Sequence, residues 1–143
     1  MNLDSTKSQA FFRFEDLRVY HKSLDFATWV ADFCTANAND ESSNYFNAFN
    51  NEALEIPYNI AEGSARNKAQ FIHYLKLAKS SVRKCIVQTS VGYKRGLISD
   101  ETQEEIRTQL MELTKMLGAL ITSLQKTIDN APEDKIEEEF GGY

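Results

Sequence analysis

Apolar residues recur along four stretches of the chain in steps of three and four positions, with polar residues between them. Residues spaced in this way lie on one face of a helix. We therefore predict helices over residues 15–36, 44–62, 68–95 and 100–130. The four apolar seams are, in chain order, Leu17, Tyr20, Leu24, Ala27, Ala31 and Cys34; Phe46, Phe49, Ala53, Ile56 and Ile60; Phe71, Leu75, Ala78, Val82, Cys85 and Thr89; and Ile106, Leu110, Leu113, Leu117, Leu120 and Leu124.

The seams repeat with a mean period of about 3.5 residues, which favours helices that pack side by side with a slight left-handed supercoil. Short connections make consecutive helices antiparallel neighbours. At 143 residues the chain is long enough to bury one core. The fold class that we predict is all-α, an antiparallel up-down-up-down four-helix bundle over residues 14–130. Residues 1–13 are expected to form an N-terminal arm, and residues 131–143 a solvated acidic tail.

The stretch from Ile56 to Gly63 combines helix-forming sequence with a helix-breaking residue. Pro57 lacks a backbone donor, and its ring is directed at the carbonyl group of Ala53, so we expect the helix to bend there. Gly63 can adopt a left-handed conformation, and we expect it to close this helix.

A polar seam lies beside the apolar one, in which Asn59, Glu62 and Arg66 follow Glu55 in steps of four, three and four. Glu62 and Arg66 are neighbours on the helix surface and can form an ion pair. Asn59 and Glu62 allow two interpretations. They either fix how this helix packs against its neighbours or another subunit, or they form a ligand or acid–base site, for which no nucleophile, metal-ligand cluster or second base is near in the sequence.

The segments between the helices carry stop and start signals. Residues 37–43 are rich in Asn, Asp and Ser, and Ser42 or Ser43 is expected to cap the second helix. Gly96 is a stop signal for the third helix. Ser99 is expected to cap the fourth helix, whose first turns are acidic and so suit the positive end of the helix dipole.

Composition narrows the functional classes. Cys34 and Cys85 occupy apolar positions of different helices without metal-ligand spacing, so reduced core thiols and a cytoplasmic location are expected. His21 and His73 are far apart in sequence and are interpreted as surface or seam residues. No secretory signal, membrane-spanning stretch, phosphate-binding loop, zinc-binding pair or nucleophile elbow occurs. We therefore expect no catalytic residue, no metal and no cofactor, and a protein that is not an enzyme.

Charge is distributed unevenly along the chain. Residues 64–99 contain eight Lys or Arg and no Asp or Glu, whereas the chain as a whole has a net charge of −5. At about 100° per residue, five of these bases fall within an arc of about 80° beside the apolar seam. They are Lys68, Lys76, Lys79, Arg83 and Lys94. The strip either contacts the phosphates of RNA or DNA, or pairs with acidic faces of the same chain or of another subunit.

Three phrases of the sequence carry a resemblance. Residues 14–20 contain Phe-Glu-Asp-Leu-Arg-Val-Tyr, residues 56–63 contain Ile-Pro-Tyr-Asn-Ile-Ala-Glu-Gly followed by Arg66, and residues 71–81 contain a Phe-x-x-x-Leu phrase before Ala-Lys-Ser-Ser. Over residues 14–125 the chain resembles the small four-helix-bundle proteins encoded by intervening sequences in bacterial large-subunit (23S) ribosomal RNA genes. It departs from their pattern at Glu55, Ser80 and Lys84, where serine, glycine and glutamate are usual.

The resemblance implies a ring-shaped homo-oligomer, a pentamer, and a more distant likeness to the accessory variability determinant protein of diversity-generating retroelements, which binds nucleic acid. The function that we predict is a non-enzymatic oligomeric protein that contacts RNA or DNA through the basic third helix. The alternative is a structural module with a protein partner, in which the basic strip is used in subunit contacts. A bundle enzyme that uses Asn59 and Glu62 is a third hypothesis, and it requires a pocket at these side chains.

Overall fold

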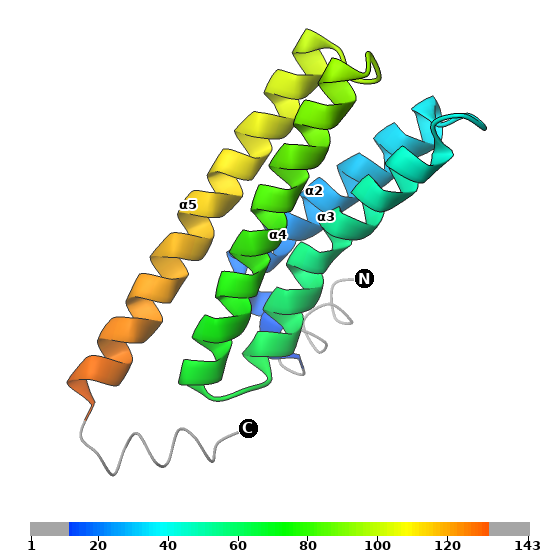
Figure 1. Ribbon diagram of the computed structural model, residues 1–143. Coiled ribbons are helices and arrows are strands. Elements are labelled where there is room, and N and C mark those ends of the chain that lie inside the picture. The colour runs from blue at the N-terminus through cyan, green and yellow to red at the C-terminus, as the bar shows by residue number, and fades with distance from the viewer. Residues whose placement is uncertain (1–11, 132–143) are drawn as a thin grey trace, which may run out of the picture.

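The computed structural model describes residues 12–131, which fold into helices joined by short connections (Figure 1). A single 3₁₀ turn, η1 (Arg13–Asp16), precedes α2 (Arg18–Asn37), α3 (Ser43–Ser64), α4 (Lys68–Lys94) and α5 (Asp100–Asn130). No strand occurs within residues 12–131. The prediction of an all-α fold with four helices is confirmed. The predicted acidic tail lies outside the described residues apart from Ala131, and so does the predicted arm apart from Phe12 and Arg13.

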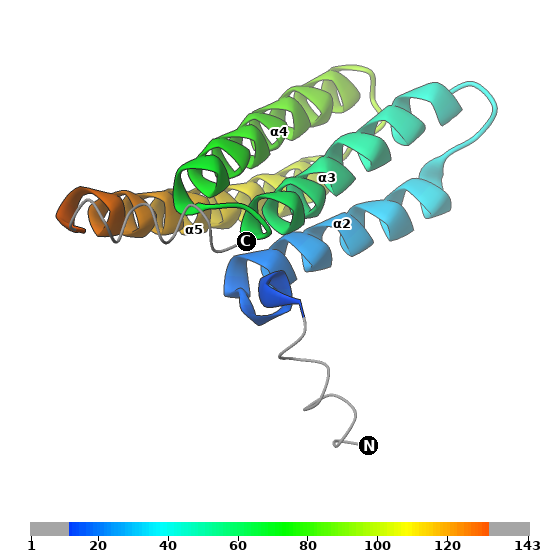
Figure 2. The ribbon, with the colours of Figure 1, turned by 90° about the horizontal axis from the view of Figure 1, so that it is seen from below.

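Each helix packs against the one that follows it in the chain, and α2 also touches α5. In Figure 1 every helix runs back along the one before it, so that the start of α4 and the end of α5 lie at the same end of the molecule. Figure 2 shows that the last turns of α5 project beyond the other three helices. None of the helices in the described region is long and apolar enough to cross a membrane.

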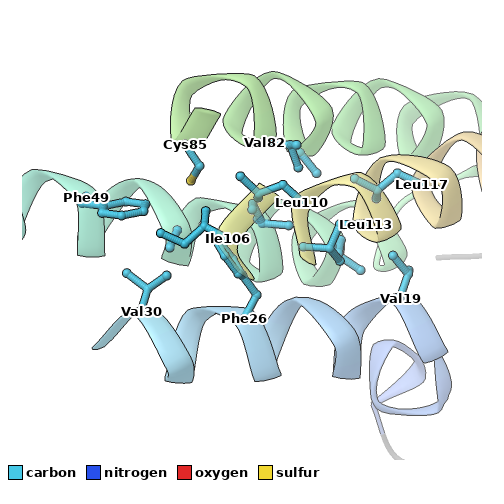
Figure 3. Packing of buried hydrophobic residues seen from close by; sticks show 14 of the residues in the cluster. Val19, Phe26, Val30, Phe49, Val82, Cys85, Ile106, Leu110, Leu113 and Leu117 are labelled. Carbon is cyan, nitrogen blue, oxygen red and sulfur yellow. The ribbon is translucent and has the colours of Figure 1, made fainter. Parts of the chain in front are cut away.

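The core lies between the four helices and is built from the predicted seams of α3, α4 and α5 (Figure 3). Every predicted seam residue of α3 and α4 is buried. In α5 the seam is buried as far as Leu117, whereas Leu120 and Leu124 are only partly covered. Burial of these side chains is the main stabilising contribution to a fold of this kind.

The predicted seam of α2 is buried at Ala27 and Cys34 but not along its whole length. Leu24 remains 39% exposed, whereas Phe26 and Val30 are buried. Apolar residues occur around more than half of this helix, so that spacing alone allows two core-facing sides. Figure 3 shows Phe26 and Val30 pointing toward the interior, where their bulk fills the space between α2 and the other helices.

The helix ends mostly follow the predicted signals. The Ser99 hydroxyl accepts a hydrogen bond from the backbone N–H of Thr102 at 3.1 Å, which confirms this cap. Gly96 has a φ of 76°, and it is the one glycine of the described region in the left-handed conformation. Ser42 occupies the N-cap position of α3 but makes no capping hydrogen bond, because its hydroxyl bonds within the preceding loop to Asn39.

The prediction that Gly63 closes its helix in a left-handed conformation is wrong. Gly63 lies inside α3, which continues to Ser64, and its φ is not positive. What requires glycine here is the close approach of α4. A Cβ atom added to Gly63 would lie 2.6 Å from the Cβ of Tyr74 and 2.9 Å from the Cδ1 of Phe71. A real Cβ atom essentially never makes a non-bonded contact this short, so the two helices can approach this closely only because residue 63 has no side chain.

Candidate nucleic-acid interface

The face of α4 that points away from the core carries most of the predicted basic residues. Lys76, Arg83 and Lys94 are exposed, and Lys79 and Lys68 are half-buried. The nine buried residues of α4 include the whole predicted seam, and the bases lie beside this buried side of the helix. We call Lys68, Lys76, Lys79, Arg83 and Lys94 the basic strip. The structure therefore keeps these bases on one helix face, as the spacing predicted.

Four of the five bases in the strip lack an ion-pair partner among residues 12–131. The ion pairs resolved between described residues join Lys22 to Glu112 at 3.2 Å and Arg66 to Glu62 at 2.6 Å. Lys76, Lys79, Arg83 and Lys94 form no ion pair with any acidic side chain of residues 12–131. Pairing within residues 12–131 therefore does not account for these four cations.

Lys79 marks the edge of the strip that faces α5. Its amino nitrogen lies 4.0 Å from the position that a Cβ would take on Gly118. The side chain therefore lies next to α5, and a bulkier residue at position 118 would meet the amine. The Lys79 amine therefore lies where α4 and α5 adjoin.

Exposed apolar side chains lie on α4 beside the basic strip, and the spacing of the charges alone does not indicate them. Val87 is 61% exposed and Val91 is 42% exposed, one turn apart on α4. Isolated exposed apolar residues are common, but two valines four positions apart lie side by side on a helix. Their spacing in the sequence could have indicated them. They give the outward face of α4 both charge and apolar surface.

Aromatic residues contribute little to the strip. Tyr93 is 42% exposed near its end, and a hydrogen bond to Asp100 raises the pKa of its hydroxyl above the usual range. Phe71 is buried. Tyr74 is half-buried, and the Arg66 guanidinium lies over its ring, with Cζ 5.2 Å from the ring centroid. The surface is therefore suited to contacts with phosphates more than to stacking with bases.

The signature residues build the joint between α3 and α4. Pro57 is buried, and α3 continues through it. Both Nε and Nη2 of Arg66 donate to the same carboxylate oxygen of Glu62, at 3.2 and 2.6 Å, and this contact raises the pKa of Arg66. Because Arg66 also covers the Tyr74 ring, it links the end of α3 to α4 across Gly63. The Glu62–Arg66 contact that the spacing predicted is present.

Asn59 bonds along its own helix. Its side-chain amide donates to the backbone carbonyl of Glu55 at 2.9 Å. Neither Asn59 nor Glu62 makes a side-chain hydrogen bond to another helix of the described chain, so the predicted role in helix-to-helix bonding is not seen within one subunit. In residues 12–131 no group of three or more His, Cys, Asp and Glu side chains is placed to hold a metal ion.

The two cysteines are buried, whereas the two histidines are exposed. Cys34 and Cys85 are buried and unpaired, and burial raises the pKa of their thiols to about 11 and about 12. His21 is exposed, with its Nε2 2.6 Å from the carbonyl oxygen of Glu15, and His73 is exposed beside Tyr74. The thiols were predicted as core residues, and that prediction is confirmed.

An acidic surface lies at the start of α5. A shallow hollow there is lined by Thr108 and by four acids of the first two turns, namely Asp100, Glu101, Glu104 and Glu105. The acids are all exposed. The molecule thus presents a basic face on α4 and an acidic face on α5, which is the charge arrangement that a contact between subunits could also use.

Comparison with known families gives one match. The family described as 23S rRNA-intervening sequence protein matches residues 15–119, which include α2, α3, α4 and the first two-thirds of α5. The matched region contains the signature residues and the whole basic strip. No curated protein matches the chain.

Proposed function

We propose that this chain, which belongs to the 23S rRNA-intervening sequence protein family, is a non-enzymatic interaction protein that binds the phosphates of RNA or DNA through the basic strip of α4. The observation that supports the proposal best is the absence of ion-pair partners for Lys76, Lys79, Arg83 and Lys94 within the described chain. Exposed cations of this kind release condensed counterions when they meet a polyanion, and this release drives binding.

The dimensions of the strip suit a nucleic-acid backbone. Lys68 and Lys94 are separated by 26 residues of continuous helix, or about 39 Å at the helical rise. A duplex completes one turn in about 34–36 Å. A helix face of this length spans about one turn measured along the duplex axis, and its flexible side chains can adjust to the phosphates that they meet without reading bases.

We also propose that the chain forms a homo-oligomer. Leu117 is the last buried residue of α5, but Leu120, Leu124 and Ile128 continue the same apolar face and remain partly exposed. Leu120 and Leu124 pack against the edge of the core, and the last turns of α5 project beyond the other helices (Figure 2). An apolar seam that continues past its own core can be covered by a neighbouring subunit. The ring-shaped pentamer implied by the family resemblance is the assembly that we propose.

Charge reversal on α4 tests nucleic-acid binding. In fluorescence anisotropy with a labelled RNA hairpin and a single-stranded DNA at low salt, Lys76→Glu with Arg83→Glu should weaken binding at least tenfold. The matched control is Lys115→Glu with Lys126→Glu on the exposed side of α5, which changes the net charge equally and should weaken binding much less. Circular dichroism should show that both variants remain folded. Equal losses in the two variants would reject the strip as the interface.

A second candidate is a structural assembly module in which the basic strip contacts the acidic start of α5 of a neighbouring subunit. The exposed Glu101, Glu104 and Glu105 favour this alternative. Light scattering decides between the two. If Lys76→Glu with Arg83→Glu dissociates the oligomer and the parent protein binds no nucleic acid, the strip serves assembly and its partner is protein.

A further inference from the structure

The chain contains an anionic segment of its own that can occupy the basic strip. We propose that residues 133–139 bind across Lys76, Lys79 and Arg83 of the same chain. This inference concerns the surface of the proposed function, but docking of the segment does not require that nucleic acid binds there. Where nucleic acid does bind, the segment competes with its phosphates.

Charge complementarity is the first argument. Residues 133–139 contain five Asp or Glu and a single Lys. The exposed cations of α4 have no acidic partner in residues 12–131. The acidic segment and the cations Lys76, Lys79 and Arg83, which have no acidic partner within residues 12–131, therefore belong to one chain.

The position of the segment is the second argument. It follows directly on α5, whose end lies at the same end of the molecule as the start of α4 (Figure 1). α4 and α5 pack against each other, and Lys79 lies beside α5 at Gly118. A segment that leaves the end of α5 thus starts at the end of the molecule where α4 begins, and the strip borders α5 at Lys79.

The length of the segment is the third argument, because it determines which bases of the strip the segment can contact. Residues 131–139 span at most about 27 Å when extended. Along α4, Lys76 lies about 12 Å and Arg83 about 22 Å from Lys68, whereas Lys94 lies about 39 Å away. Helices in contact are separated by about 8–10 Å, which adds little to the diagonal distance. The carboxylates of residues 137–139 can therefore reach Lys76, Lys79 and Arg83 but not Lys94.

Tethering makes such a contact effective. A single exposed ion pair is weak, but a segment attached to the same molecule has an effective concentration in the millimolar range. Several carboxylates can then occupy the strip together, and salt will release them. The expected consequence is a strip that is partly occupied and that admits only polyanions able to displace the segment.

A zero-length carbodiimide, which joins a carboxylate to a lysine amine, tests the docking directly. After digestion and mass spectrometry of the full chain, residues 133–139 should be joined to Lys76 and Lys79 at least fivefold more often than to Lys94. The yield should fall in 1 M salt. In a mixture of ¹⁴N- and ¹⁵N-labelled protein, the joined peptides should carry one label only. Equal yields at Lys94, no joined peptides, or mixed-label products would overturn the proposal.

Neutralising the segment tests the competition separately. Replacing Glu133, Glu137, Glu138 and Glu139 by Gln should tighten binding of the RNA hairpin three- to tenfold at low salt, and should have no effect when Lys76→Glu and Arg83→Glu are also present. Cross-links without RNA binding would support the docking and reject the proposed function. RNA binding that this replacement leaves unchanged, without cross-links, would reject the docking and support the proposed function.

Discussion

Replacing Gly63 by Ala should have two opposing effects on stability, namely a gain in helix propensity and a clash with α4. Alanine favours a helix by up to about 1 kcal/mol relative to glycine, less in a last turn. Gly63, however, lies where α3 meets α4, and a new Cβ would be 2.6 Å from the Cβ of Tyr74. A Cβ atom is fixed by its backbone and cannot rotate away, so the two helices must move apart. Forced overpacking of this kind costs typically about 1–3 kcal/mol.

Gly118 provides the matched control. It also lies inside a helix, but the nearest heavy atom to an added Cβ is the Lys79 amino nitrogen at 4.0 Å, at the end of a flexible side chain. Gly118→Ala should therefore gain the helix propensity without the clash. The propensity gain is similar in both variants, so the difference between them measures the contact at the α3–α4 joint.

Urea denaturation followed by circular dichroism at 222 nm gives the free energy of unfolding. We expect Gly63→Ala to be less stable than Gly118→Ala by about 1–3 kcal/mol. A Gly63→Ala protein as stable as Gly118→Ala would show that α3 and α4 do not approach each other as closely as the structure indicates, and the explanation of the glycine would fail.

Three further predictions follow from the caps, the thiols and the exposed seam. Ser99→Ala removes the acceptor of the Thr102 N–H and should lower the free energy of unfolding in urea by about 1 kcal/mol. Burial raises the pKa of the Cys34 and Cys85 thiols to about 11 and about 12, so the folded state keeps protons that the unfolded state loses above about pH 9. The contribution of the thiols to the urea midpoint should therefore be constant below pH 9 and should fall as the pH rises from 9 toward 12. Replacing both cysteines by Ala should reduce this fall of the midpoint. Leu124→Glu should reduce the mass measured by light scattering while the helical signal is retained, and an unchanged mass would show that the end of α5 is not a subunit contact.

The sequence predicted the helices well because each seam repeats over several turns and ends at a recognisable signal. In α4 every predicted seam residue is buried, and in α5 Ser99 caps the helix as expected. The predicted seam of α2 was wrong at Leu24, although Ala27 and Cys34 are buried, because apolar residues occur on more than one side of this helix and periodicity did not decide which side faces the core. Burial of Phe26 depends on the shapes of the other helices, which no local pattern contains.

The candidate site was predictable in its charge but not in its surroundings. The spacing of Lys76 and Arg83 placed them on one face, because helical geometry fixes that relation. Whether acidic side chains would neutralise them depended on how α4 packs against the other helices. Gly63 shows the same limit, because a glycine near a helix end indicates either a left-handed residue or a close contact, and only the position of Tyr74 distinguishes these.

The salt dependence of RNA binding tests the central claim most directly. If the four cations without partners in the described chain, Lys76, Lys79, Arg83 and Lys94, contact phosphates, the logarithm of the association constant for single-stranded RNA should fall with the logarithm of the salt concentration with a slope of about −3. For Lys76→Glu with Arg83→Glu the slope should be shallower by about 1.4. An identical slope for the parent and the double variant, or no binding even at the lowest salt, would contradict a phosphate-binding role for the outward face of α4.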